Sequence, residues 1–116
     1  EALMLCMLAL VDPGDEVLLP TPRFMSYDSA VEMCGGVVVP VPTDEADDFA
    51  SVPEAFEQRI TDRTKVLVLV TPNNPTGAVT PPEMVRRIAD IAIKHDLIVI
   101  SDEIYEKLIY EGNEHL

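Results

Sequence analysis

An aspartate and a tyrosine follow the apolar run LIVI at residues 97–100. Asp102 comes two positions after the run, and Tyr105 follows three residues later. A carboxylate at the end of a buried strand loses hydration unless a cation or several donors meet it, and Lys107 is the nearest cation in sequence. Taken alone, the pair favours a helix N-cap for Asp102 and a core aromatic for Tyr105.

Two further loops carry unusual side chains directly after apolar runs. TPNNPTG (71–77) follows KVLVLV, and TPRF (21–24) follows EVLLP. Pro, Asn and Gly are typical of a turn, because Pro presets φ, Asn bonds locally and Gly allows a positive φ. A turn leaves open what the amides of Asn73 and Asn74 do at the end of a buried strand.

Apolar runs and helical patterns alternate along the whole chain. We expect helices over 2–11 and 25–33, and two more that begin at Ser51 and Thr80, each with a Glu three residues later as in a capping box. The expected strands are 16–20, 37–41, 65–70 and 97–101. The pattern predicts an α/β fold, an open and mainly parallel sheet with helices on both faces. The near-continuous apolar runs at 65–70 and 97–101 predict strands that are covered on both faces.

The carboxyl ends of parallel strands lie at one edge of a sheet, where α/β proteins bind ligands. The loops TPRF, TPNNPTG and the segment SDEIY (101–105) each follow a predicted strand. We therefore expect the three loops to face the same side of the sheet.

Together, these segments resemble a known family. PRF (22–24), NNPTG (73–77) and SDEIY (101–105) resemble the large domain of class I/II, fold-type I, aminotransferases that use pyridoxal 5'-phosphate (PLP), and the separation of 28 positions from Asn74 to Asp102 suits that family. The opening EALMLCMLALVDPGDEVLLPTP resembles the helix and strand that follow the cofactor-phosphate loop of that family. The resemblance covers nearly the whole chain and implies part of a PLP-binding large domain.

The resemblance also implies roles for the loop residues. The Asp102 carboxylate would hold the proton on the pyridine nitrogen of PLP, which improves the ring as an electron sink. Asn74 and Tyr105 would donate hydrogen bonds to the phenolic oxygen of the ring, and Phe24 would stack on one ring face. Tyr27 would stand behind Asp102, or would be a half-buried tyrosine of its helix.

We expect simpler roles for Asn73 and Arg23, which lie next to Asn74 and Phe24. Asn73 is expected only to shape its loop. Arg23 invites a role in binding a substrate carboxylate, but an exposed loop arginine is the interpretation that we prefer.

Other parts that the family needs do not match this sequence. The Schiff-base lysine of the family lies downstream in a Ser-Lys context, which Lys65, Lys94 and Lys107 do not match. The phosphate loop would precede Glu1, and the substrate-carboxylate arginine would come from a small domain. We expect residues 1–116 to be a partial large domain that is inactive alone. The resemblance implies that the longer protein is a homodimer that transfers an amino group between an L-amino acid and a 2-oxo acid.

The composition excludes several classes of partner. Asp and Glu number 21 against 8 Lys and Arg, a net charge of −13, which disfavours nucleic acid and anionic membranes as partners. The apolar runs are far shorter than the roughly 20 residues of a membrane span. The acid excess allows two interpretations, a solvated face or an adaptation to high salt. Cys6 and Cys34 lack metal-ligand spacing and are expected to be reduced core thiols, which favours a cytoplasmic setting.

Two other functions are compatible with the sequence. One is a flavodoxin-like module that binds a metal or a phosphate through Asp102 and Glu103, although adjacent residues leaving a strand point in different directions. The other is an inert α/β interaction domain.

Overall fold

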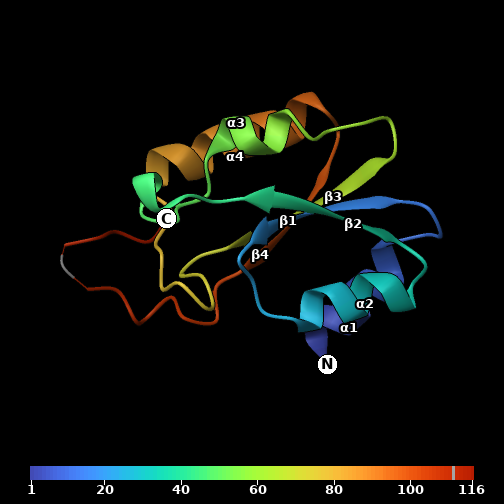
Figure 1. Ribbon diagram of the computed structural model, residues 1–116, viewed down its shortest axis with the longest axis horizontal. Coiled ribbons are helices and arrows are strands. Elements are labelled where there is room, and N and C mark those ends of the chain that lie inside the picture. The colour runs from blue at the N-terminus through green and yellow to red at the C-terminus, as the bar shows by residue number, and fades with distance from the viewer. Residues whose placement is uncertain (111) are drawn as a thin grey trace.

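The computed structural model describes residues 1–110 and 112–116, which form a parallel sheet with helices on both faces (Figure 1). The elements in chain order are α1 (Ala2–Leu10), β1 (Glu16–Thr21), α2 (Ser26–Met33), β2 (Val37–Pro42), the 3₁₀ turn η1 (Glu45–Asp47), α3 (Pro53–Glu57), β3 (Thr64–Val70), α4 (Pro82–Lys94) and β4 (Ile98–Asp102). The α/β class and the alternation predicted from the sequence are confirmed.

The order of the strands places the three loops of interest together. The sheet has the order β2-β1-β3-β4, and each neighbouring pair is parallel. The chain therefore moves outward from β1 to β2 and then returns to the other side of β1 for β3 and β4. Such a reversal opens a crevice beyond the carboxyl ends of the strands on either side of it. The loops after β1, β3 and β4 all leave the sheet at that edge.

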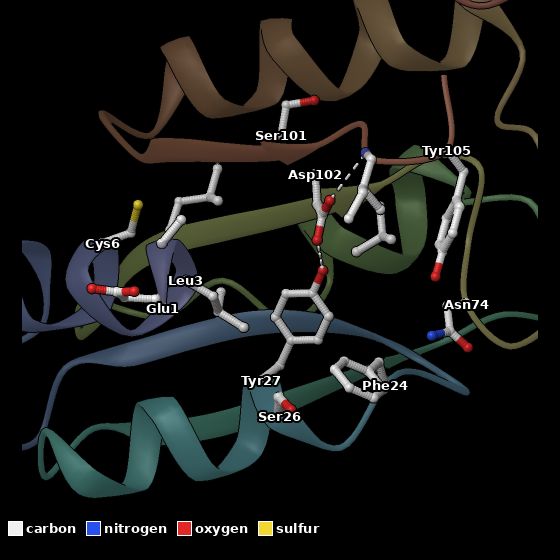
Figure 2. Close-up of a pocket in the computed structure, with 14 residues that line it drawn as sticks. Glu1, Leu3, Cys6, Phe24, Ser26, Tyr27, Asn74, Ser101, Asp102 and Tyr105 are labelled. Carbon is white, nitrogen blue, oxygen red and sulfur yellow. Dashed lines mark hydrogen bonds between the residues drawn. The ribbon is translucent and has the colours of Figure 1, made fainter. Parts of the chain in front are cut away.

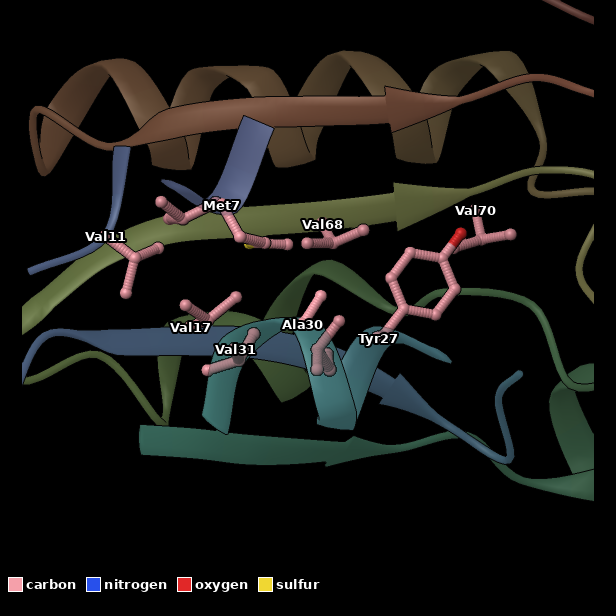
Figure 3. Packing of buried hydrophobic residues seen from close by; sticks show 10 residues of the cluster. Met7, Val11, Val17, Tyr27, Ala30, Val31, Val68 and Val70 are labelled. Atoms are coloured by element: carbon pink, nitrogen blue, oxygen red, sulfur yellow. The ribbon is translucent and has the colours of Figure 1, made fainter. Parts of the chain in front are cut away.

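Two apolar cores hold the helices onto the sheet. Along β1 and β3, successive side chains point to opposite faces, as the period of a strand requires. The residues of the first core, between the sheet and α1 and α2 (Figure 3), are Met7, Val11, Val17, Leu19, Tyr27, Ala30, Val31, Val66, Val68 and Val70. The residues of the second core, on the side of α3 and α4, are Leu18, Val41, Phe56, Leu67, Leu69 and Ile88. Both faces of β3 are buried, as predicted, and so are both faces of β1.

The same prediction is wrong for β4. Ile98 and Val99 are 39% and 41% exposed, although Ile100 packs against the first core. The physical reason is position, because β4 is the last strand in the order and, within the described residues, pairs only with β3. A continuous apolar run therefore did not indicate a strand covered on both faces here.

The two predicted capping boxes are also wrong. The helices α3 and α4 begin at Pro53 and Pro82, and neither N-cap residue makes a side-chain cap hydrogen bond. The Thr80 hydroxyl instead accepts a hydrogen bond from the Ser51 backbone N–H at 3.2 Å, and the Thr80 N–H donates to Thr71 Oγ1 at 3.0 Å. These buried contacts tie the end of the 71–80 loop to the segment before α3.

None of the helices in the described part of the chain is long and apolar enough to cross a membrane. Cys6 and Cys34 are free, and both are partly rather than fully buried. Cys34 packs against the first core, and Cys6 faces the cavity described below.

Candidate functional site

A cavity of about 600 Å³ lies at the carboxyl edge of the sheet (Figure 2). The four residues proposed from sequence as cofactor ligands all line it, and so does Tyr27. The full lining is Glu1, Ala2, Leu3, Cys6, Phe24, Ser26, Tyr27, Val70, Asn74, Ile100, Ser101, Asp102, Ile104 and Tyr105. The expectation that the three loops face one side is confirmed.

Asp102 accepts hydrogen bonds from two groups. The Tyr27 hydroxyl donates to Asp102 Oδ2, and the Ile104 backbone N–H donates to Oδ1 at 3.3 Å. A turn rather than a helix follows, at 104–107, so the N-cap interpretation of Asp102 is wrong. Tyr27 is 2% exposed and joins the first core, so it is both a core tyrosine and the residue behind Asp102.

The proton of the Tyr27 hydroxyl is firmly held. Burial of the phenol and the neighbouring Asp102 carboxylate raise the pKa of Tyr27 far above its usual range. Both causes disfavour a second negative charge beside Asp102. Tyr27 therefore acts as a fixed hydrogen-bond donor, and Asp102 remains the acceptor.

Glu16 shows how this chain accommodates a carboxylate that is purely structural. Its side chain is 5% exposed and accepts hydrogen bonds from Thr61 Oγ1 at 2.6 Å and from Arg63 Nη2 at 2.6 Å. The Thr61 hydrogen bond and the Arg63 guanidinium hold the pKa of Glu16 below its usual value. Asp102 has no such cation among the described residues, because none of the ion pairs found there includes it. A partly buried carboxylate without a cation fits a ligand that supplies one.

Polar and aromatic groups stand at the opposite end of the cavity from Cys6. Figure 2 shows the Tyr105 hydroxyl and the Asn74 amide at this end, with Phe24 beside them. Neither the Tyr105 hydroxyl nor the Asn74 amide takes part in the hydrogen bonds found in the described part of the chain, so both keep their donors for a ligand. Phe24 is 51% exposed and offers a ring face to the cavity.

Asn73 shapes the loop, as predicted. Its Nδ2 donates to the Pro22 carbonyl at 3.2 Å and to Thr76 Oγ1 at 2.9 Å. Its carbonyl accepts from the Gly77 N–H at 2.7 Å, and Gly77 has a φ of +73° that favours glycine. The Asn73 side chain thus joins the loop after β3 to the loop after β1 and leaves the Asn74 side chain in the cavity.

Other residues considered from sequence lie elsewhere. The preferred interpretation of Arg23 as an exposed loop arginine is wrong, because its side chain is 14% exposed and forms an ion pair with Asp28. Glu103 is exposed, accepts a hydrogen bond from the Ser101 hydroxyl at 2.7 Å and does not line the cavity. No group of three metal-ligating side chains occurs in the described residues. Lys65, Lys94 and Lys107 form ion pairs away from the cavity.

The lining also includes residues that sequence reasoning missed, namely Leu3 and Cys6 of α1, and Ser26. The first helix is apolar on all sides, so periodicity could not show which of its faces meets the sheet. Ser26 could have been found from its place beside Tyr27 at the start of α2.

Comparisons with known proteins agree with this geometry. The family model described as aminotransferase class I and II matches residues 1–115. The chain belongs to the class I and II aminotransferase family. Members of this family use PLP.

Individual relatives match almost the whole chain. The aspartate/prephenate aminotransferase of Thermus thermophilus is 49% identical over 115 residues, which are 99% of this chain and 30% of that protein. The aromatic-amino-acid aminotransferase 2 of Thermococcus litoralis is 40% identical over 112 residues, 97% of this chain and 29% of that protein. The structure of the aspartate aminotransferase from Thermus thermophilus with maleate has a TM-score of 0.95 at 47% identity, covering 99% of this chain and 30% of the other. The chain thus spans about 30% of the length of these relatives.

Proposed function

We propose that these residues form the part of a PLP-dependent aminotransferase that holds the cofactor ring, in an enzyme that transfers an amino group between an L-amino acid and a 2-oxo acid. The observation that carries the proposal is Asp102, a carboxylate in a cavity, backed by the Tyr27 hydroxyl and without a cation in the described chain. The curated relatives include enzymes named for aspartate, prephenate, aromatic amino acids and alanine, so the proposal extends no further than the substrate class.

The residues of the cavity suit this cofactor. PLP, when bound, stores negative charge in a pyridine ring, and it does so best when the ring nitrogen is protonated. The Asp102 carboxylate would keep a proton on that nitrogen through a charge-assisted hydrogen bond. The Tyr27 hydroxyl, which donates to Asp102, would hold the carboxylate in place. Asn74 and Tyr105, which line the cavity, would donate to the phenolic oxygen, and the exposed ring of Phe24 would cover one face.

In this proposal, the Schiff-base lysine and the other catalytic parts of the enzyme lie outside residues 1–116. No lysine lines the cavity within residues 1–110 and 112–116, and the chain spans about 30% of its relatives. The Schiff-base lysine, the phosphate loop and the small domain with the substrate-carboxylate arginine belong to the other 70% or so of such a protein. By the same resemblance, the longer protein is a homodimer, and the two free cysteines suit a cytoplasmic location.

An absorbance measurement tests the function. We expect the full-length polypeptide that contains these residues to show a visible absorbance band when PLP is added, and to form a 2-oxo acid from an L-amino acid. The isolated segment 1–116 should show neither, because most anchoring groups are missing. The absence of a visible band in the full-length polypeptide would contradict the proposal. Measurable 2-oxo acid formation by the segment alone would contradict our assignment of the missing parts.

The acid excess leads to a second expected outcome. If the net charge of −13 is an adaptation to high salt, thermal stability should keep rising as KCl increases to molar concentrations. Simple screening of a solvated acidic face would saturate at roughly 0.1–0.2 M, where the Debye length falls to about 8–10 Å. Thermal unfolding in a KCl series separates the two, and a Tm that stays flat above that range excludes the high-salt interpretation.

A further inference from the structure

The connection between β1 and α2 is closed by a single arginine. Arg23 Nε donates to Asp28 Oδ2 at 2.9 Å, and its Nη2 donates to the other oxygen of the same carboxylate. Its Nη1 donates to the hydroxyl of Thr21. Thr21 is the last residue of β1, and Asp28 lies in the first turn of α2. The guanidinium therefore joins the end of the strand to the start of the helix.

All three contacts lie close to the protein interior. The Arg23 side chain is 14% exposed, whereas those of Arg63 and Arg87 are 70% and 54% exposed. The hydrogen bond from Arg23 holds the pKa of Asp28 below its usual value, against the effect of desolvation. The Asp28 carboxylate thus stays charged at neutral pH, and each of its two oxygens accepts a hydrogen bond from the one guanidinium. Arg23 has no comparable set of donors left for a substrate carboxylate.

Phe24 lies inside the segment that this ion pair closes. It lines the cavity but belongs to neither buried core. Its ring therefore depends on the backbone on both sides for its position. The first turn of α2 is bonded directly to Phe24, because the Tyr27 N–H donates to the Phe24 carbonyl at 3.3 Å. Tyr27 also immediately precedes Asp28 and donates its hydroxyl to Asp102.

We propose that Arg23 is a positioning residue for the cofactor ring, which acts through its ion pair with Asp28 to hold Phe24 over the cavity and the Tyr27 hydroxyl against Asp102. The inference rests on the proposed function, since it concerns the orientation of the ring in that site. Phe24 would cover one face of the ring and Asp102 would meet one edge of it. The ion pair between Arg23 and Asp28 would support both contacts.

The full-length polypeptide saturated with PLP allows a direct test. We expect Arg23→Ala to lower kcat by about 10–100-fold with KM for the amino acid within about 3-fold, because misplaced reacting groups reduce the rate more than the binding. The visible circular dichroism of the bound cofactor should fall, while the visible absorbance at saturating PLP remains. Asp28→Asn should act in the same direction. Arg23→Lys should give an intermediate value, since an ammonium keeps the charge but lacks the planar fork.

Arg87→Ala is the matched control. It removes an ion pair with Glu54 between α3 and α4, on the other face of the sheet, where both side chains are about half exposed. It should leave kcat and the circular dichroism unchanged.

Unchanged kcat and circular dichroism in Arg23→Ala would overturn the inference, and so would a rise in KM alone, which would indicate direct contact with the substrate. If Arg23→Ala does not fold, the same comparison applies to Arg23→Lys. A full-length protein that shows no visible band before any substitution contradicts the proposed function instead.

Discussion

Replacement of Asp102 by asparagine is expected to reduce transamination more than any other single change in the cavity. Asp102→Asn keeps the size of the side chain and removes its charge. The pyridine nitrogen then loses the ionic partner that keeps it protonated, and the ring withdraws electrons less effectively. The expected loss of kcat is larger than the roughly 10–1000-fold that the loss of one neutral donor costs in a dry site, because a charge interaction is lost. Steady-state kinetics of the full-length enzyme measures it.

Two comparisons make this result specific to the ring nitrogen. PLP methylated on that nitrogen carries a permanent positive charge, so it should restore part of the activity of Asp102→Asn. Glu103→Gln changes the neighbouring carboxylate, which is exposed and lies outside the cavity, and should leave the activity unchanged. Near-normal turnover of Asp102→Asn would contradict the cofactor assignment. A comparable loss in Glu103→Gln would favour the metal-binding alternative.

The sequence predicted those parts of the fold that depend on local pattern. The apolar runs at 66–70 and 17–20 became the buried parts of β3 and β1, because a strand buried on both faces needs apolar residues along its length. The order of strands and helices then placed Phe24, Asn74, Asp102 and Tyr105 at one edge, where parallel strands end.

The remaining features depend on contacts that no local pattern encodes. Tyr27 and Asp102 meet across 75 positions of sequence. The family resemblance implied this contact, but local pattern did not, because only the folded sheet places α2 beside the end of β4. The Arg23 and Asp28 pair is five residues apart, which is not the spacing of neighbours on a helix face, and forms because the chain turns between β1 and α2. The exposure of Val99 follows from the position of β4 in the strand order.

Asn74→Ala should separate hydrogen bonding to the cofactor from support of the loop. The Asn74 amide makes no hydrogen bond to other described residues and lines the cavity, so its loss should not affect folding. We expect kcat/KM to fall by about 10–1000-fold, the cost of one donor to a charged oxygen in a dry site. The donor stabilises the negative phenolic oxygen of the cofactor. Its removal should therefore raise the pH at which the visible absorbance band changes, as a spectroscopic pH titration would show.

The neighbouring asparagine provides the matched comparison. Asn73→Ala removes the hydrogen bonds to the Pro22 carbonyl and to Thr76 Oγ1. The Pro22 carbonyl then loses the donor found for it in the described residues, whereas Thr76 Oγ1 keeps the Ala78 N–H. This change should lower the free energy of unfolding by about 1–3 kcal/mol. Thermal unfolding should thus distinguish two adjacent residues of the same type, with a lower Tm for Asn73→Ala and an unchanged Tm for Asn74→Ala. A Tm that falls equally in both variants, with no shift in the absorbance titration of Asn74→Ala, would show that Asn74 supports the loop rather than the cofactor.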